Sequence, residues 1–133
     1  MHNPMARIMI ADDSPDNRMM FRDLMEMNNH EIIAELKNGL NVVEKFFQYN
    51  PDILLLDLAM PQKDGMVILH EIKDKAPDAD IIVISASDSE KIITRCLKNG
   101  ATAFIPKPFE IDELSNAISD ILTCRRRSNG LSS

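Results

Sequence analysis

The stretch that decides the fold is Ile53-Leu54-Leu55-Leu56-Asp57, a short apolar run that ends in an acid. A run that is apolar on both faces is typical of a strand in a parallel sheet with helices on each side. Four further short apolar runs recur along the chain, at residues 8–11, 32–34, 81–84 and 103–105. The run around Ile32 is flanked by Glu31 and Glu35, which favours an edge strand.

Helical periodicity fills the gaps between these runs. A first helix is predicted from Ser14-Pro15, which offer a cap and a first-turn proline, to about Asn28. Others are predicted over residues 40–49, from 65 to 76, over 89–99 and from 110 onward. The residues predicted to face inward are Met20, Phe21, Leu24, Met27, Leu40, Val43, Phe46, Phe47, Val67, Ile68, Ile72, Ile93, Cys96, Leu97, Gly100, Ile111, Leu114, Ile118, Ile121 and Leu122. This alternation predicts an α/β domain with an open, doubly wound, five-stranded parallel sheet.

Composition excludes several classes of function. The chain has 133 residues, 15 basic and 21 acidic side chains and a formal charge of −6, which fits one domain and disfavours a surface that grips nucleic acid throughout. With one Tyr and no Trp, it has no aromatic ladder for stacking bases. Cys96 and Cys124 lie far apart and are interpreted as reduced thiols. The amino terminus lacks a secretory pattern and the apolar runs are too short to span a bilayer, so we expect a cytoplasmic domain that contacts no membrane.

Chemically active side chains follow the predicted strands. Asp12-Asp13 follow the first strand, Asp57 ends the third, Ser85 ends the fourth, and Lys107 follows the fifth. If the first and third strands are neighbours, these side chains converge at the carboxyl edge of the sheet, where such folds place their sites. Three carboxylates held close together repel each other, and Mg²⁺ with oxygen ligands would compensate them. A cation, an ammonium and a hydroxyl around one carboxylate describe a site for a transferring phosphoryl group.

The same positions resemble those of a known family. The sequence resembles the receiver domain of bacterial response regulators in Asp12-Asp13, in Asp57 followed by Met60-Pro61 and Asp64-Gly65, in Ser85-Ala86 and in Lys107-Pro108. The resemblance covers essentially residues 6–124, and the domain is predicted to span residues 5–124. It implies a flavodoxin-like fold with strand order 2-1-3-4-5. It also implies a phosphorylation-dependent signalling switch that catalyses only its own phosphorylation and dephosphorylation.

The resemblance assigns roles at the acidic pocket. Asp57 is implied to be the nucleophile, which accepts a phosphoryl group from a sensor histidine kinase or a phosphotransfer protein. Asp13, Asp57 and the backbone carbonyl of Ala59 are implied to ligate Mg²⁺ directly, and Asp12 mainly through water. Without the resemblance, Asp12 and Asp13 could also be interpreted as a helix cap, because Asp is common there.

Further roles concern the bound phosphoryl group. The resemblance implies that Lys107 pairs with its oxygens, that Ser85 donates a hydrogen bond to one of them, and that the backbone N–H groups of Ala59 and Ala86 contribute. It also implies a cis peptide bond before Pro108. Phe104 occupies the family's aromatic switch position and has no hydroxyl, so switching is expected to depend on burial of its ring.

Two small side chains suggest a long-lived phosphorylated state. Ala59 and Ser87 lie two residues beyond Asp57 and Ser85, and in the family these positions flank the path of the hydrolytic water. Because alanine cannot orient that water and serine is short, slow self-dephosphorylation is expected.

Two surfaces are candidates for partner binding. On the first helix, Pro15, Arg18 and Met19 lie near the predicted site and could belong to a kinase-docking surface. On the fourth helix, Lys91, Arg95 and Lys98 form a basic stripe, interpreted either as a solvated face or as part of an output surface with the fifth strand and fifth helix. That surface would bind a downstream effector, and pairing of the stripe with acids of the fifth helix in a homodimer is a further alternative.

The carboxyl-terminal residues leave the output open. Residues 125–133 are predicted to be a basic, flexible tail or the start of a linker. In the second case the chain would be the N-terminal receiver part of a longer DNA-binding or enzymatic response regulator, although direct binding of nucleic acid is not expected for this domain. A Mg²⁺-dependent aspartyl phosphohydrolase is disfavoured, because haloacid dehalogenase-like enzymes use Asp-x-Asp on the first strand and Asp57 is followed by Leu58-Ala59.

Overall fold

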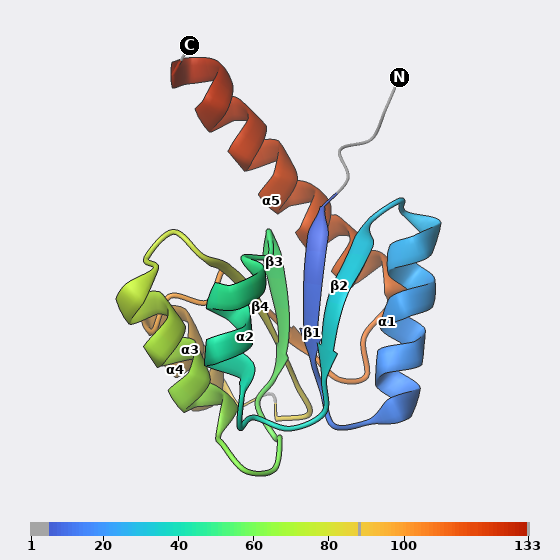
Figure 1. Ribbon diagram of the computed structural model, residues 1–133, viewed down its shortest axis with the longest axis vertical. Coiled ribbons are helices and arrows are strands. Elements are labelled where there is room, and N and C mark those ends of the chain that lie inside the picture. Colours follow the sequence, from blue (N-terminus) through green and yellow to red (C-terminus); the bar gives the residue numbers. More distant parts are fainter. Residues whose placement is uncertain (1–5, 88, 133) are drawn as a thin grey trace.

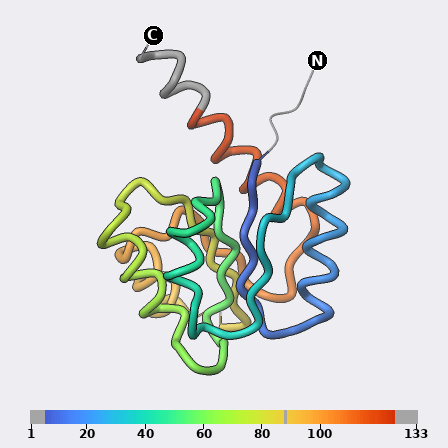
Figure 2. The backbone as a smooth tube through the Cα atoms, viewed as in Figure 1, coloured from blue at the N-terminus to red at the C-terminus, as the bar shows by residue number. Residues whose placement is uncertain are grey.

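The computed structural model describes residues 6–87 and 89–132 and forms one parallel sheet of five strands (Figure 1). The strands are β1 (Arg7–Ala11), β2 (Glu31–Leu36), β3 (Ile53–Asp57), β4 (Asp80–Ser85) and β5 (Ala103–Pro106), in the spatial order β2-β1-β3-β4-β5. The predicted fold class and strand order are therefore confirmed. Figure 2 shows β1 and β3 side by side near the middle of the sheet, although α1, β2 and α2 separate them in sequence.

Five helices alternate with the strands. They are α1 (Pro15–Met27), α2 (Val42–Tyr49), α3 (Gly65–Lys75), α4 (Glu90–Lys98) and α5 (Ile111–Ser132). Three of them begin at a side-chain cap, because Ser14, Asp64 and Ser89 each accept a hydrogen bond from a backbone N–H in the first turn of the helix. No helix in the described part of the chain combines the length and apolarity needed to cross a bilayer.

The strands bury both faces, as the apolar runs predict. Alternate residues of the central strand point to opposite sides: Ile53 and Leu55 pack in the cluster with α1 and α5, whereas Leu54 and Leu56 pack in the cluster with α2, α3 and α4. The edge strand β2 is only partly buried along its length. Burial on both sides leaves the two ends of the sheet as the places where polar side chains of the strands can meet.

Several helices are rotated relative to the predicted apolar faces. On α1 the buried side chains are Phe21, Leu24 and Met25, whereas Met27, predicted to face inward, is 76% exposed. Met20, Leu24 and Met27 satisfy helical spacing as well as the true stripe does, so periodicity alone could not choose between them. Side chains predicted to be inward that are likewise exposed are Met20, Leu40, Phe47, Val67, Leu97 and Ile111.

Helix α5 extends into residues 125–133, which were predicted to be a flexible tail or the start of a linker. The helix continues to Ser132. Arg125 anchors it, since its Nε lies 2.7 Å from Oδ2 of Asp80 and its Nη2 donates to the carbonyl oxygen of Asp52 at 2.9 Å. The predicted domain boundaries stay predictions, and Met5 and Ser133 lie outside the described residues.

Candidate functional site: an acidic pocket at the strand ends

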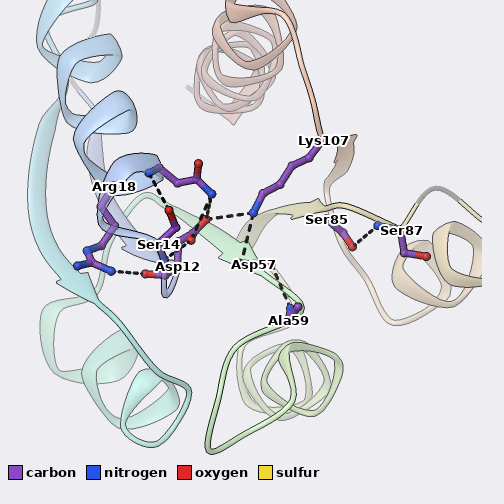
Figure 3. A network of polar contacts seen from close by, with 9 residues as sticks. Asp12, Ser14, Arg18, Asp57, Ala59, Ser85, Ser87 and Lys107 are labelled. Atoms are coloured by element: carbon purple, nitrogen blue, oxygen red, sulfur yellow. Dashed lines mark hydrogen bonds and ion pairs between the residues drawn. The ribbon is translucent and has the colours of Figure 1, made fainter.

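Asp12, Asp57 and Lys107 meet at the carboxyl edge of the sheet, with Ser85 at the end of the neighbouring strand (Figure 3). Because β1 pairs directly with β3, Asp12 and Asp13 lie next to Asp57. One carboxylate oxygen from each of the three residues lies within 4.8 Å of the other two. Asp12 and Asp57 are 1% and 4% exposed, whereas Asp13 is exposed. Two carboxylates of this cluster are thus buried and the third is exposed.

Asp12 is held in one orientation by several donors. Its Oδ1 accepts from the backbone N–H of Ser14 at 2.9 Å, and its Oδ2 accepts from the Asn17 amide at 3.3 Å and from Lys107 Nζ at 3.4 Å. Arg18 donates to its backbone carbonyl at 2.6 Å. A carboxylate with these partners is fixed before any ligand binds.

Two of these donors have roles that the sequence alone did not reveal. Asn17 was not predicted at all; it lies in the first turn of α1, where its amide reaches the Asp12 carboxylate. Arg18 was predicted to belong to a docking surface, yet its guanidinium lies inside the domain between the Asp12 carbonyl and Glu35, at 3.6 Å from the latter. Arg18 therefore also helps to hold the pocket.

Asp57 lies between opposing charges. Lys107 Nζ is 3.5 Å from its Oδ2, and the backbone N–H of Ala59 donates to its Oδ1 at 3.1 Å. Burial raises the pKa of Asp57 above its ordinary value, and the Asp12 and Asp13 carboxylates raise it further, while the Ala59 N–H and Lys107 lower it. The net direction is upward, so without further positive charge the ionised form of Asp57 is costly in this pocket.

The two residues predicted to act in switching lie on β4 and β5. Ser85 is buried at the end of β4, and its Oγ accepts from the backbone N–H of Ser87 at 3.1 Å. Among the described residues no hydrogen bond joins Ser85 to Asp57. Phe104, on β5, is half-buried and packs against the core cluster of α2, α3 and α4. The predicted cis peptide bond between Lys107 and Pro108 is present.

The donor set fits a hard divalent cation. Three carboxylates and one ammonium leave the pocket with an excess of negative charge, which a cation would offset. All available ligand atoms are oxygens. Mg²⁺ prefers oxygen ligands, whereas softer metals prefer nitrogen or sulfur. Metal binding is therefore compatible with these residues.

The two candidate partner surfaces are exposed in part. Pro15 and Met19 are exposed on α1, and Met19 lines an apolar groove together with Ile111 at the start of α5. The basic stripe of Lys91, Arg95 and Lys98 is exposed on α4. Their roles in binding stay predictions.

Comparison with known proteins identifies the family. Residues 8–119 match the family described as the response regulator receiver domain. The chain is 39% identical over 116 residues to chemotaxis protein CheY of Bacillus subtilis (strain 168), which covers 87% of this chain and 97% of that protein. It is 35% identical over 115 residues to chemotaxis protein CheY of Thermotoga maritima, which covers 86% of this chain and 96% of that protein.

A solved structure shares the architecture. The CheX-CheY-BeF3-Mg+2 complex from Borrelia burgdorferi contains a chain that superposes with a TM-score of 0.84 at 29% identity, over 90% of each chain. The receiver-domain match and the CheY relatives support a phosphorylation-dependent signalling switch rather than a classical enzyme. The chain belongs to the response regulator receiver domain family. The relatives above are matched over nearly their whole length, so the comparisons do not favour the alternative of a longer regulator.

Proposed function

We propose that Asp57 is the residue that becomes phosphorylated, by transfer from a sensor histidine kinase or a histidine phosphotransfer protein. The observation that carries the proposal is the position of Asp57, buried at the end of β3 with an ammonium at 3.5 Å and two further carboxylates beside it. Asp12 already has three donors on its carboxylate, so it is the less available nucleophile of the two buried acids. A cytoplasmic location, where such donors present their phosphohistidines, belongs to the same proposal.

Mg²⁺ is the proposed cofactor. Asp13, Asp57 and the backbone carbonyl of Ala59 would hold it, and Asp12 would act through water. When bound, the ion neutralises carboxylate charge and the charge on phosphoryl oxygens. The Borrelia burgdorferi complex combines CheY with BeF3 and Mg²⁺, which supports a cation in the equivalent pocket here.

The chain's own residues then account for the transfer. A carboxylate oxygen of Asp57 attacks phosphorus and forms the new P–O bond, while the bond from phosphorus to the donor's nitrogen or oxygen breaks and its electron pair leaves with the donor group. A phosphohistidine donor leaves as an imidazole that takes up a proton from solvent. Lys107, which already reaches Asp57, pairs with the phosphoryl oxygens, and the backbone N–H groups of Ala59 and Ala86 donate to them.

The output is proposed to pass through the face formed by α4, β5 and α5. Ser85 would turn its hydroxyl from the Ser87 N–H toward the phosphoryl group, and Phe104 would move into the space that this leaves. The movement would change the affinity of that face, with its stripe of Lys91, Arg95 and Lys98, for a downstream effector. Docking of the kinase is assigned to Pro15 and Met19, which are exposed on α1, and to the part of the Arg18 side chain that reaches solvent.

Intact-mass measurement after incubation with acetyl phosphate and MgCl₂ tests the proposal. Wild-type protein should gain one phosphoryl group, which EDTA should prevent, and Asp57→Asn should gain none. Asp74→Asn, which removes an exposed carboxyl from α3, is the matched control and should be labelled like the wild type. Labelling of Asp57→Asn to the wild-type extent would refute the assignment.

A further inference from the structure

A short loop connects the two sides of the acidic pocket. Residues 37–39, called here the bracing loop, follow Leu36 at the end of β2, and Leu36 and this loop together make backbone hydrogen bonds to both sides. At one end the carbonyl oxygen of Leu36 accepts from the N–H of Asp12 at 3.0 Å. At the other end the N–H of Gly39 donates to the carbonyl oxygen of Pro61 at 2.9 Å. The first contact holds an acid of the pocket, and the second holds the segment that follows Asp57.

The contact at Gly39 requires a residue without a side chain. A methyl group at Gly39 would overlap the carbonyl oxygen of Lys63 and lie 2.8 Å from the Cβ of Lys63. Gly39 is buried, and the obstructing oxygen belongs to the backbone, which cannot swing away as the end of a flexible side chain can. The bracing loop itself is stiffened by Asn38, whose Oδ1 accepts from the N–H of Leu40 at 3.0 Å.

The segment that Gly39 holds carries part of the pocket. Residues 58–64 connect Asp57 to α3 and include Ala59, whose N–H donates to the Asp57 carboxylate. Gln62 has a φ of 78°, a left-handed conformation that is unfavourable for a residue with a side chain. On the far side of Gln62, Lys63 pairs with Glu71 of α3 at 2.6 Å. The strained segment is thus held from both sides, by Gly39 and by the Lys63–Glu71 pair.

We infer that Gly39 is a positioning residue for the cation site. By joining the Asp12 side to the segment that carries Ala59, the bracing loop sets the separation between the carboxylates of Asp12 and Asp13 and the backbone carbonyl of Ala59. Gly39 touches neither ion nor phosphoryl group and acts through Pro61 and Lys63. The inference rests on the proposed function, because it assumes that Ala59 contributes a ligand for Mg²⁺.

Calorimetric titration of MgCl₂ into EDTA-treated, dialysed protein tests the inference on Gly39→Ala. Displacement of a residue that supports metal ligands commonly weakens metal binding by about 10- to 100-fold, so the dissociation constant for Mg²⁺ should rise by about 10-fold or more. The Mg²⁺ concentration that gives half-maximal labelling by acetyl phosphate should rise by the same factor. The maximal labelling rate at saturating Mg²⁺ should stay within about twofold of wild type, since binding of the ion restores the ligand geometry.

The control variant must destabilise the fold without contacting residues 58–64. Gly100 lies between α4 and β5 with a φ of 96°, so Gly100→Ala strains the backbone at a different place. Its melting temperature should fall while its Mg²⁺ dissociation constant stays at the wild-type value. If Gly39→Ala does not fold, Asn38→Ala replaces it, because this change adds no atoms and only loosens the bracing loop; a rise of about threefold in the dissociation constant is then expected.

The outcomes separate the inference from the function on which it rests. A wild-type dissociation constant for Gly39→Ala, or equal losses of affinity in Gly39→Ala and Gly100→Ala, overturns the positioning role while the proposed function stands. A wild-type dissociation constant for Asn38→Ala has the same meaning where that variant is the one tested. Failure of the wild type itself to bind Mg²⁺ overturns the proposed cation site and the inference with it.

Discussion

Replacing Asp57 by Asn should stabilise the protein when Mg²⁺ is absent. The change keeps the shape of a side chain that is 4% exposed and removes its charge. Burial and the two neighbouring carboxylates raise the pKa of Asp57, which means that the folded protein binds the proton of this group more tightly than the unfolded chain does. At neutral pH the group is ionised in the unfolded chain, so forcing the same charge into the pocket lowers the free energy of unfolding.

The magnitude follows from the distances in the pocket. At an effective dielectric constant of about 20, the repulsion between two carboxylates whose oxygens lie within 4.8 Å of each other costs at least about 3.5 kcal/mol, and the attraction to Lys107 at 3.5 Å contributes about 4.7 kcal/mol. The repulsion from Asp13 is weaker than this, because Asp13 is exposed and solvent screens it. The charges therefore nearly cancel, and the cost of burying the carboxylate decides the sign. We expect Asp57→Asn to be more stable by about 1–3 kcal/mol.

Thermal unfolding followed by circular dichroism measures the difference. In EDTA at pH 7, Asp57→Asn should melt at least about 3 °C above the wild type. The gap should shrink as the pH falls, because Asp57 then takes up its proton in the folded state and the wild type loses the buried charge. The gap in melting temperature begins to shrink when the pH falls to the folded-state pKa of Asp57, and the shrinkage is complete near the ordinary value of 3.8. Added MgCl₂ should stabilise the wild type more than the variant, since it binds the folded wild type more tightly.

Three results would refute the reasoning. They are an Asp57→Asn variant that melts at or below the wild-type temperature in EDTA, a gap that does not depend on pH, and equal stabilisation of both proteins by Mg²⁺. Asp74→Asn is again the matched control, and its melting temperature should stay near that of the wild type, because its carboxyl is exposed.

Other regions of the chain give further predictions. Burial lowers the pKa of His30, whose Nδ1 accepts a hydrogen bond from the Ala6 N–H at 3.2 Å, so the unfolded chain takes up the proton first as the pH falls below 6.5. Between pH 8 and pH 5 the melting temperature of the wild type should therefore fall by more than that of His30→Gln, and equal falls would contradict this. Arg125→Met should lower the free energy of unfolding, measured in urea, by about 1–2 kcal/mol and should leave labelling of Asp57 unchanged; the expected loss is small because the Arg125 side chain is 39% exposed. Unaltered stability would show that the contacts with Asp52 and Asp80 do not stabilise the fold. Ala59→Asn and Ser87→Glu should alter the rate at which the phosphorylated protein decays, followed by intact mass after removal of acetyl phosphate, and wild-type lifetimes in both would count against slow self-dephosphorylation through small side chains.

The strands and the pocket could be predicted because their signals are local. A run such as Ile53-Leu54-Leu55-Leu56-Asp57 is buried on both faces wherever it lies in a parallel sheet, and the acid at its end must then reach the carboxyl edge. The convergence of Asp12, Asp13 and Asp57 needed one further fact, the pairing of β1 with β3, which the family resemblance implied and the structure confirms.

The helix faces could not be predicted to the same standard. On α1, Met20 and Met27 lie on one flank of the buried stripe of Phe21, Leu24 and Met25, and Met suits either a buried or an exposed position because it is flexible and only moderately apolar. The choice is made by the neighbour: Phe21 stacks on Phe109, with ring centroids 6.0 Å apart, and this partner lies in the segment between β5 and α5. No pattern within the first helix contains that information.

The supports of the pocket were missed for a related reason. Asn17, Arg18 and Gly39 carry no signal of metal or phosphoryl chemistry, and each matters through a backbone group or a carboxylate that lies outside its own helix or loop. A residue that reacts can be recognised by its type, whereas a residue that holds another in place can be recognised only by what it contacts. The space beside Lys63 that admits a glycine and not an alanine is a property of two loops folded against each other. Both loops must therefore be in place before the geometry of the cation site is defined, which couples the folding of β2 and the loop after it to the chemistry at the end of β3.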